Sequence, residues 1–488
     1  MARETTISKP KTQNNMKRRD FFRNTALTAA GAALVSPLQA ISTPRSGIVG
    51  QYAGKKAKNI IFMVSDGMSA GTLGMANVLR ERRDGKLSPW MSLYADNKVV
   101  RGLMDTASAN SLVTDSSAAS SSWGGGVRVN NGAVNIAPDG SKPLPILQKF
   151  KAAGKAVGLV TTVTVTHATP AGFTVNSERR SDEPGIAQQY YDLRIDLIMG
   201  GGIEHFSADR RSDKQDLFGK FSESGYQVVR TRDEMLALEK NKARTPVLGV
   251  FSVGGLPYAL DRENDAELKR TTPSIAEMTK AAIAQLSKNR DGFVMQVEGG
   301  KVDWAAHAND IGGLVYDQLA FEEAVEAAIA FAEADGETLV VITTDHGNAN
   351  PGLFDGSFDD FDRVISFKHT NDWVLQGMDR GFTADQVIER IEAAQGIVIR
   401  ADDAMRLLTH YVTDRNEDGL YNPYKLPFSD FSKIQQRYTG IGWGSSGHSG
   451  DHVEIAAFGP GSELLKPFVR NTDMHYLMLQ AAEVSNKF

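Results

Sequence analysis

This 488-residue chain contains several apolar runs that are each followed, within three residues, by an acidic residue. Runs of this length and composition predict buried strands. The clearest examples, each with its acidic residue, are Asn59–Val64 with Asp66, Phe293–Met295 with Glu298, and Thr338–Thr344 with Asp345. Because parallel strands place their carboxyl ends at one edge of a sheet, these carboxylates are expected to meet there. We therefore predict an α/β fold, a three-layer sandwich with a central, mostly parallel sheet flanked by helices, plus an inserted subdomain.

The stretch Gln296–Asn309 carries the densest group of ligand-type side chains. If a helix begins after its two glycines, Asp303 and His307 lie on one face, one turn apart. Oxygen and nitrogen ligands of this kind suit zinc, and Glu298 at the preceding strand end suits a harder ion such as magnesium. An Asp–His hydrogen bond at a solvated helix start explains the same residues. Taken alone, this stretch leaves both interpretations open.

Two other segments carry reactive or anion-binding side chains. Small residues after Ser116 predict a helix that another element can approach closely. Ser116 or Ser117 at its N-terminus would face the positive end of the helix dipole, which favours an alkoxide or a phosphate. A simple Ser/Asp cap on a packed helix is the alternative. Further along, a predicted strand over 156–164 leads to His167, with Arg179 and Arg180 shortly after.

The first 40 residues form a separate segment. Lys17–Arg23 contains a twin-arginine pattern, Thr25–Val35 is small and apolar, and Pro37–Ala40 offers a cleavage site. The apolar part is too short to span a bilayer, so we interpret residues 1–40 as a Tat signal peptide. This predicts export by the Tat machinery to the periplasm, with or without later release. The rest of the chain contains no candidate transmembrane run.

Composition limits the chemistry further. The chain has no cysteine, so a metal site must use histidine and carboxylate ligands. Its net charge is −5, and residues 1–40 hold seven Lys/Arg against two Asp/Glu, which leaves −10 on the remainder. A chain this acidic is not expected to bind nucleic acid as a specific partner.

We expect one catalytic domain over 47–488, with residues 207–290 forming helices and loops beside the sheet. Residues 352–445 are richer in charge and aromatics and are interpreted as an insertion. Because it lies between Asp345-His346 and His448, it must leave and return at one edge, and we expect a lid or crown that shapes substrate access or a homodimer contact. Asp414–Gly419 resembles half of a calcium loop, but Lys425 stands where Glu is expected. A structural Ca²⁺ at Asp414–Asp418 and a solvated turn both remain open.

These segments, in this order, resemble the bacterial and animal alkaline phosphatases from about Asn59 to the C-terminal region. The matching motifs are Asp66, Asp115-Ser116, His167-Ala168-Thr169-Pro170, Glu298 with Asp303 and His307, Asp345-His346, and His448-Ser449-Gly450. Chance agreement at all six is negligible. The resemblance implies metal-dependent hydrolysis of phosphate monoesters at alkaline pH through a phosphoserine intermediate.

The resemblance also implies roles for individual residues. Asp303, His307 and His448 would hold one Zn²⁺. Asp66, Asp345 and His346 would hold a second Zn²⁺ beside the nucleophile Ser116. Asp66 would also bridge to a Mg²⁺ held by Thr169 and Glu298. Arg180, eleven residues after Thr169, would grip the phosphate and be oriented by Asp115, whereas a one-residue slip would choose Arg179.

Two positions depart from the best-studied bacterial form. His167 and Trp304 stand where that form has Asp and Lys, a combination that resembles marine and cold-adapted members and bears on the third ion. These two side chains are expected beside the metal ligands. Ser117 also replaces the usual Ala after the nucleophile.

Two other functions remain as alternatives. A phosphodiesterase or a sulfatase of the same superfamily would share the metal ligands. A diesterase has less use for an arginine clamp, however, and a sulfatase needs a C/S-x-P-x-R context that Ser116 lacks. A non-catalytic calcium- or surface-binding protein is the second alternative, which activity lost to EDTA and restored by zinc plus magnesium would exclude.

Overall fold

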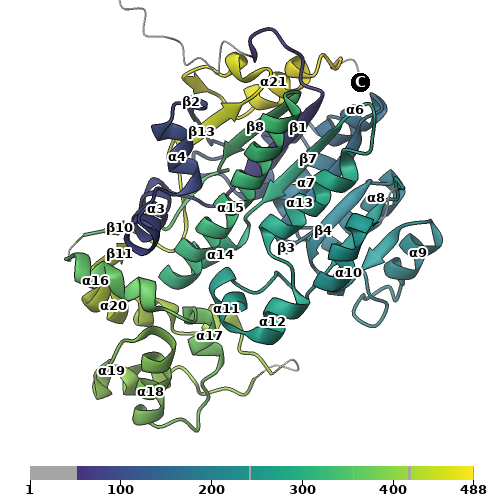
Figure 1. Cartoon of the computed structure of the whole chain (residues 1–488). Helices are drawn as coiled ribbons and strands as arrows, with labels where there is room; N and C mark the ends of the chain where they lie inside the picture. The colour runs from purple at the N-terminus through teal and green to yellow at the C-terminus, as the bar shows by residue number, and fades with distance from the viewer. Residues whose placement is uncertain (1–51, 241–242, 355–356, 416–418, 487–488) are drawn as a thin grey trace, which may run out of the picture. The chain divides into compact units, whose positions relative to one another are not determined.

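A ten-stranded sheet runs through the computed structural model (Figure 1), which describes residues 52–240, 243–354, 357–415 and 419–486. The predicted signal peptide over 1–40 lies outside the described residues. Across the sheet the strands are β14 (Phe468–Val469), β2 (Val100–Met104), β13 (Val453–Phe458), β8 (Thr338–Thr343), β1 (Asn59–Val64), β7 (Phe293–Glu298), β3 (Ala156–Thr164), β4 (Leu197–Gly201), β6 (Val247–Val250) and β5 (Gln227–Val229). All pairs are parallel except those of β13, which confirms the predicted mostly parallel sheet.

The register of the three central strands aligns their carboxyl ends. Val64 of β1 pairs with Glu298 of β7 on one side and with Thr343 of β8 on the other. Asp66 and Asp345 therefore leave the sheet at the level where Glu298 ends its strand. The three strand-end carboxylates meet at one edge, as the sequence predicts.

The one antiparallel strand brings a fourth segment to this edge. β13 pairs with β8 through Ile455 and Thr343, so that β13 begins where its parallel neighbours end. Shortly before it, β12 (His448–Ser449) pairs with β9 (Gly347–Asn348). His448 therefore reaches the same edge from the opposite chain direction.

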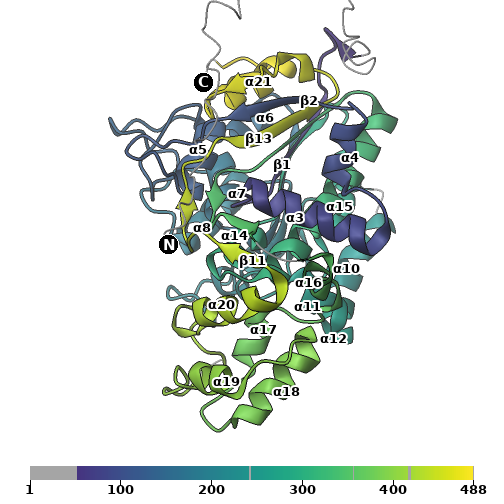
Figure 2. The same ribbon diagram turned by 90° about the vertical axis from the view of Figure 1, so that its left-hand side faces the viewer.

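Helices cover both faces of the sheet (Figures 1 and 2). Side chains of β1 alternate between two cores: Ile61 and Met63 join one, and Ile60 and Phe62 join the other. The first core includes side chains of α3 (Ala70–Asp84), α4 (Pro89–Ala95), α10 (Arg232–Leu236), α11 (Ala259–Asn264), α13 (Ile275–Leu286), α14 (Lys301–His307) and α15 (Ile311–Asp335), with α12 (Ala266–Thr271) following α11. The second includes side chains of α5 (Ser116–Gly125), α6 (Ile146–Ala152), α7 (Ala168–Thr174), α8 (Glu183–Leu193), α9 (Leu217–Glu223) and α21 (Asp473–Ala481). This is the predicted three-layer sandwich.

The expectation for residues 207–290 is wrong in one respect. Besides helices and loops, this stretch contains β5 and β6, which extend the sheet beyond β4. The two strands have three and four residues, too few to show a periodic pattern in the sequence. Pairing of β6 with β4, and of β5 with β6, makes them strands, rather than a local sequence pattern.

Residues 352–445 form a mainly helical group, drawn in light green to yellow-green at the bottom of Figures 1 and 2. Its helices are α16 (Phe358–Asp362), α17 (Asn371–Gln376), α18 (Ala384–Gln395), α19 (Ala401–Leu408) and α20 (Phe428–Thr439). The chain leaves through β10 (Pro351–Leu353) and returns through β11 (Ile441–Trp443), which pair antiparallel. Exit and return therefore lie together, as expected, while the lid or crown role stays a prediction.

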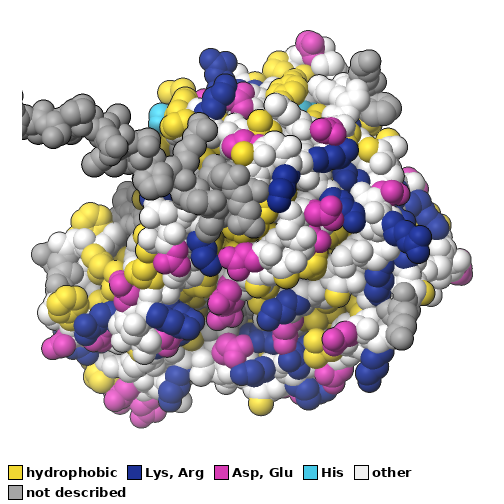
Figure 3. Space-filling view, turned by 45° about the horizontal axis from the view of Figure 1, so that its top comes forward, with side chains coloured by type: hydrophobic (Ala, Val, Ile, Leu, Met, Phe, Trp, Pro, Cys, Tyr) yellow, Lys and Arg dark blue, Asp and Glu magenta, His cyan; other side chains and the backbone are white. Residues whose placement is uncertain are grey.

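Short 3-10 helices complete the secondary structure at Ile203–His205, Ala237–Lys240, Arg363–Ser366, Pro423–Lys425 and Ser462–Leu464. Of the helices in the described ranges, none is both long and apolar enough to cross a membrane. Figure 3 shows acidic and basic side chains interspersed over the described part of one face.

Candidate active site

Four carboxylates lie buried where the central strands end. Asp66, Glu298, Asp303 and Asp345 are at most 5% exposed. Both carboxylate oxygens of Asp66 and one oxygen each of Glu298 and Asp345 have no hydrogen-bond partner among the described residues. Burial, together with the charges of Asp345, Asp303 and Glu298, raises the pKa of Asp66 well above its ordinary value. Carboxylates held this way need compensating positive charge.

Asp303, His307 and His448 form the first group that could hold a cation, with ligand atoms within 4.8 Å of one another. His307 Nδ1 lies 2.8 Å from Ser446 O, and His448 Nδ1 lies 2.9 Å from Thr114 O. Since a carbonyl only accepts, both Nδ1 atoms carry the proton and both Nε2 atoms present lone pairs. These two Nε2 atoms are 3.0 Å apart. A cation between them fits this donor set and would remove the repulsion.

The start of α14 explains how two of these ligands come together. The helix begins directly after Gly300, so Asp303 and His307 stack one turn apart with Oδ2 and Nε2 separated by 3.4 Å. A Cβ at Gly300 would lie 2.6 Å from a Val163 methyl carbon, so only glycine fits the approach of β7 to β3. The predicted stacking of Asp303 and His307 on one helix face is confirmed.

The second group surrounds Ser116. The hydroxyl oxygen of this fully buried side chain lies 3.3 Å from His346 Nε2, which is 3.1 Å from Asp345 Oδ2 and 3.7 Å from Asp66 Oδ1. Around His346, the three side chains whose ligand atoms all lie within 4.8 Å of one another are Asp66, Asp303 and His346, with Asp303 in the place of the predicted Asp345. Although burial opposes it, the charge of the adjacent His346 imidazole lowers the pKa of Asp345. The structure thus brings Ser116 into contact with the predicted second metal group.

The third group contains Asp66, Glu298 and Thr169. Thr169 Oγ1 is buried without a hydrogen-bond partner in the described ranges, as is Glu298 Oε1. His167 Nδ1 lies 3.5 Å from Glu298 Oε1 and 4.0 Å from Asp66 Oδ2. Its other nitrogen, Nε2, accepts a hydrogen bond from Arg180, which can only donate. Neutral His167 therefore carries its proton on Nδ1, facing Glu298, rather than a lone pair for a metal.

Trp304 completes this side of the site. Its ring stands edge-on to that of His167 at a centroid distance of 6.5 Å. Lys301 Nζ lies 4.8 Å from the Trp304 ring centre and 3.6 Å from the Tyr258 ring centre. Both predicted neighbours of the metal ligands, His167 and Trp304, thus lie at the third group.

Asp115 links the nucleophile helix to an arginine. Its carboxylate accepts from Ala118 N at 2.9 Å as the N-cap of α5 and lies 3.2 Å from Arg180. Burial alone would raise the pKa of Asp115, but Arg180 and the hydrogen bonds from Ala118 and Ser117 lower it overall. Ser117 Oγ donates to Asp115 at 2.8 Å, so its hydroxyl is occupied there, whereas Ser116 faces His346.

The two adjacent arginines have different surroundings. Arg180 is partly buried and contacts Asp115 and His167. Arg179 is exposed and lines a separate cavity with Asn131 and Gly132. Of the two, only Arg180 faces the metal groups.

Three side chains of the site were not identified from the sequence. Thr161 Oγ1 donates to Glu298 Oε2 at 2.6 Å, and Asn348 Nδ2 donates to Asp303 Oδ1 at 2.7 Å. Asn131 Oδ1 accepts from Asp115 N at 3.2 Å. Thr161 lies inside a strand, opposite Glu298 in the β3–β7 register, so only the strand pairing could have pointed to it.

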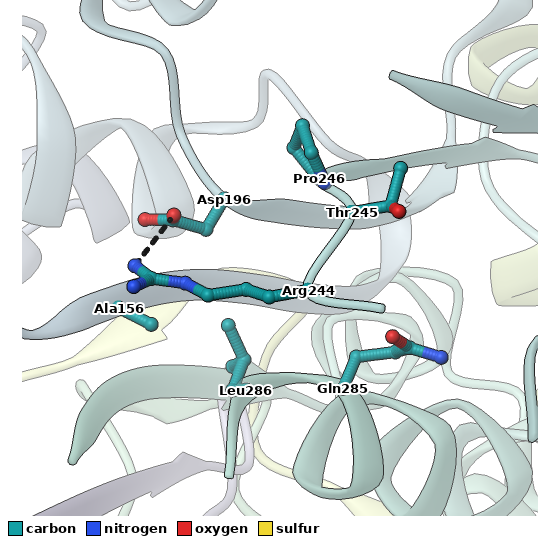
Figure 4. A pocket seen from close by; sticks show the side chains of 7 residues that line it. All are labelled: Ala156, Asp196, Arg244, Thr245, Pro246, Gln285 and Leu286. Atoms are coloured by element: carbon teal, nitrogen blue, oxygen red, sulfur yellow. Dashed lines mark hydrogen bonds and ion pairs between the residues drawn. The ribbon is translucent and has the colours of Figure 1, made fainter. Parts of the chain in front are cut away.

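Two other features lie away from these groups. A cavity of about 160 Å³ sits at the amino ends of β3, β4 and β6, where Arg244 pairs with Asp196 at 3.4 Å (Figure 4), and it contains none of the predicted site residues. The proposed calcium loop is described only in part, because residues 416–418 lie outside the described ranges. Asp414 is exposed and pairs with Arg380 at 3.3 Å.

A sheet edge that gathers carboxylates and imidazoles around a buried serine and an arginine defines a metal-binding hydrolase. Comparison with known families identifies which one. The family model described as alkaline phosphatase matches residues 57–484. The chain therefore belongs to the alkaline phosphatase family.

Individual relatives agree with this assignment. Alkaline phosphatase 3 of Bacillus subtilis is 32% identical over 441 residues, which cover 88% of this chain and 90% of the relative. The crystal structure of Thermus thermophilus alkaline phosphatase superposes with a TM-score of 0.80 at 32% identity, covering 92% of this chain and 96% of that one. The cold-active alkaline phosphatase of a psychrophilic Shewanella gives 0.73 at 26% identity, covering 87% and 99%. The predicted fold class, family and enzyme class are confirmed.

Proposed function

We propose that this enzyme hydrolyses phosphate monoesters through a phosphoserine formed on Ser116, with divalent ions at the three ligand groups. The observation that carries the proposal is the position of Ser116 Oγ. It lies 3.3 Å from His346 Nε2, inside a ring of buried ligand atoms, while the Asp115 carboxylate beside it pairs with Arg180. The nucleophile Ser116, the metal-ligand side chains and the anion-binding Arg180 thus lie at one site.

The ligand sets suggest which ions bind where. Two carboxylate-and-imidazole groups suit Zn²⁺: one has Asp303, His307 and His448, and the other has Asp66, Asp345 and His346. The all-oxygen set of Asp66, Glu298 and Thr169 suits Mg²⁺. When bound, such ions would lower the pKa of a serine hydroxyl and neutralise charge on phosphate oxygens.

The chain's own residues would act on the ester as follows. Ser116 gives up its hydroxyl proton to solvent and Oγ attacks phosphorus, so that the Oγ–P bond forms as the ester P–O bond breaks. The departing alkoxide takes up one proton from solvent and leaves as the alcohol. Water then cleaves the Oγ–P bond, releases inorganic phosphate and restores Ser116. The N-terminal position of Ser116 on α5 favours negative charge at Oγ and on the phosphoryl group.

Arg180 would select monoesters. Its guanidinium, held by Asp115, can donate two parallel hydrogen bonds to non-bridging phosphate oxygens. A monoester has three non-bridging oxygens and a diester has only two. If Arg180 occupies two of them, only a monoester keeps a further non-bridging oxygen that can bind the ions.

The test compares 4-nitrophenyl phosphate with bis(4-nitrophenyl) phosphate over pH, for wild type, Ser116→Ala and Ser117→Ala. We expect alkaline monoesterase activity that is abolished in Ser116→Ala and reduced far less in Ser117→Ala. Acid quenching and peptide mass spectrometry should find phosphate on Ser116 of the wild type. Preference for the diester would exclude the monoesterase proposal, and full activity of Ser116→Ala would exclude this nucleophile.

We also propose that the enzyme is exported through the Tat pathway to the periplasm, because the N-terminal segment has the twin-arginine pattern. Replacing Arg18 and Arg19 by lysine should retain the protein in the cytoplasmic fraction. Unchanged periplasmic activity of that double variant would exclude the proposal.

A further inference from the structure

A cavity of about 520 Å³ lies beside the clamp formed by Asp115 and Arg180. Residues between Asn130 and Gly140 form one wall, and Glu178 with Arg179 forms the other. The Arg179 guanidinium makes no hydrogen bond or ion pair with any residue in the described ranges. An arginine without a partner that lines a cavity is available to a ligand.

The cavity wall is built from the same backbone that holds the clamp. Gly132 N donates to Asp115 Oδ2 at 2.9 Å, and Arg180 N donates to Gly132 O at 2.8 Å. The two walls are joined by a β-bridge in which Val134 and Ser177 exchange hydrogen bonds of 2.9 Å. The cavity is therefore a fixed neighbour of the clamp formed by Asp115 and Arg180.

The lining indicates what kind of group would bind. The Glu178 carboxylate lies 3.8 Å from Lys142, and this ion pair offsets the negative charge of Glu178. Because the charge of Arg179 is not offset, the net charge of the cavity lining is positive. Ile136, Ala137 and Pro138 add an apolar surface. Together these features suit an organic body that ends in an oxyanion.

We propose that this cavity is a leaving-group subsite and that Arg179 favours phosphate monoesters whose alcohol part carries a second oxyanion group, such as a carboxylate. The inference rests on the proposed monoesterase function and adds a substrate class to it. Arg180 grips the phosphoryl group that is transferred, and Arg179 contacts the part that leaves.

The test uses two esters of similar size, 4-carboxyphenyl phosphate and 4-carbamoylphenyl phosphate, which differ by one negative charge. Each variant is scored by the ratio of its kcat/KM for the carboxylate ester to that for the amide ester, so that general changes in activity cancel. Arg179→Gln should lower this ratio about threefold to fivefold, the upper part of the range for an exposed ion pair. Arg179→Lys should keep part of the preference, because it keeps the charge.

Glu178→Gln is the matched control from the same wall and should raise the ratio. The wild-type ratio should also fall as ionic strength rises from about 0.02 M to about 0.5 M, since salt screens exposed charges. An unchanged ratio in Arg179→Gln would overturn the subsite. Absence of turnover of both esters by the wild type would instead count against the proposed function.

Discussion

The helices that carry Ser116 and Thr169 touch through glycine backbones, and this contact offers a sharp test of how the site is positioned. Gly124 of α5 packs on Gly172 of α7: a Cβ at Gly124 would lie against the Gly172 carbonyl, 2.7 Å from its carbon. A Cβ at Gly172 would in turn lie 2.6 Å from Ser120 Cβ. Gly124→Ala must therefore separate the two helices.

The magnitude follows from the distances. Carbon atoms in contact are ~3.5–4.0 Å apart, so the backbones must move by about 1 Å. The neighbourhood cannot absorb this shift easily, because Trp123, Phe62 and Phe173 fill the adjacent core with ring centroids 5.1 to 6.4 Å apart. Overpacking of this kind costs about 1–3 kcal/mol. A shift of about 1 Å between Ser116 and Thr169 should lower kcat/KM about 100-fold.

The assay pairs urea unfolding with kcat/KM for 4-nitrophenyl phosphate. Gly74→Ala is the matched control, because Gly74 is exposed in α3 and a Cβ there meets no atom within 4 Å. We expect this control to keep full activity and to gain about 0.5–1 kcal/mol from the better helix propensity of alanine. If Gly124→Ala were as active and as stable as the control, the glycine contact would not position the site.

Three further predictions concern a buried carboxylate, the ligand groups and one hydrogen bond. Burial raises the pKa of Asp317 from its usual 3.8 to about 7. Between these two pH values the folded protein keeps a proton on Asp317 that the unfolded chain has lost. The free energy of unfolding therefore falls by about 1.4 kcal/mol for each pH unit of increase in this range. Asp317→Asn should therefore be more stable than wild type by about 4 kcal/mol at pH 9, with a gain that shrinks toward pH 4; a pH-independent difference in urea midpoints would refute the argument. EDTA should lower the Tm, and zinc plus magnesium should restore it, because each ion at a hundredfold excess over its Kd adds about 2.7 kcal/mol to the free energy of unfolding; an unchanged Tm would mean that the buried carboxylates need no ion. Thr161→Val removes the 2.6 Å hydrogen bond to Glu298 and should raise the Mg²⁺ concentration for half-maximal activity while leaving the Zn²⁺ requirement as it was; equal effects on both ions would show general damage.

Much of the site could be predicted because strand ends in a parallel sheet are equivalent positions. Asp66, Glu298 and Asp345 each follow a short apolar run, and the sheet register alone brings them together. Asp303 and His307 needed only helix geometry. For His448 local pattern was insufficient, since its position depends on β13 running antiparallel to β8.

The remaining residues were missed for a physical reason: their roles depend on pairing between distant segments. Thr161 is one of several threonines in an apolar strand until β3 is aligned with β7. Asn348 meets Asp303 only because β9 and β12 pair beside α14. β5 and β6 likewise become strands through the sheet edge that they extend. Sequence patterns report local preference, and these contacts are not local.

The carboxylate of Asp66 is shared by two of the three ligand groups and couples them. It belongs to both the imidazole-containing group at His346 and the oxygen group at Glu298. Without cations, burial and the neighbouring carboxylates raise its pKa, so a proton competes for the site. A first cation bound at Asp66 would remove that competition and would lower the cost of ionising Asp66 for a second. Because the net charge of the chain is negative, the proposed binding of a phosphate dianion would depend on local positive charge from ions at these groups and from Arg180, and removal of the ions should weaken it.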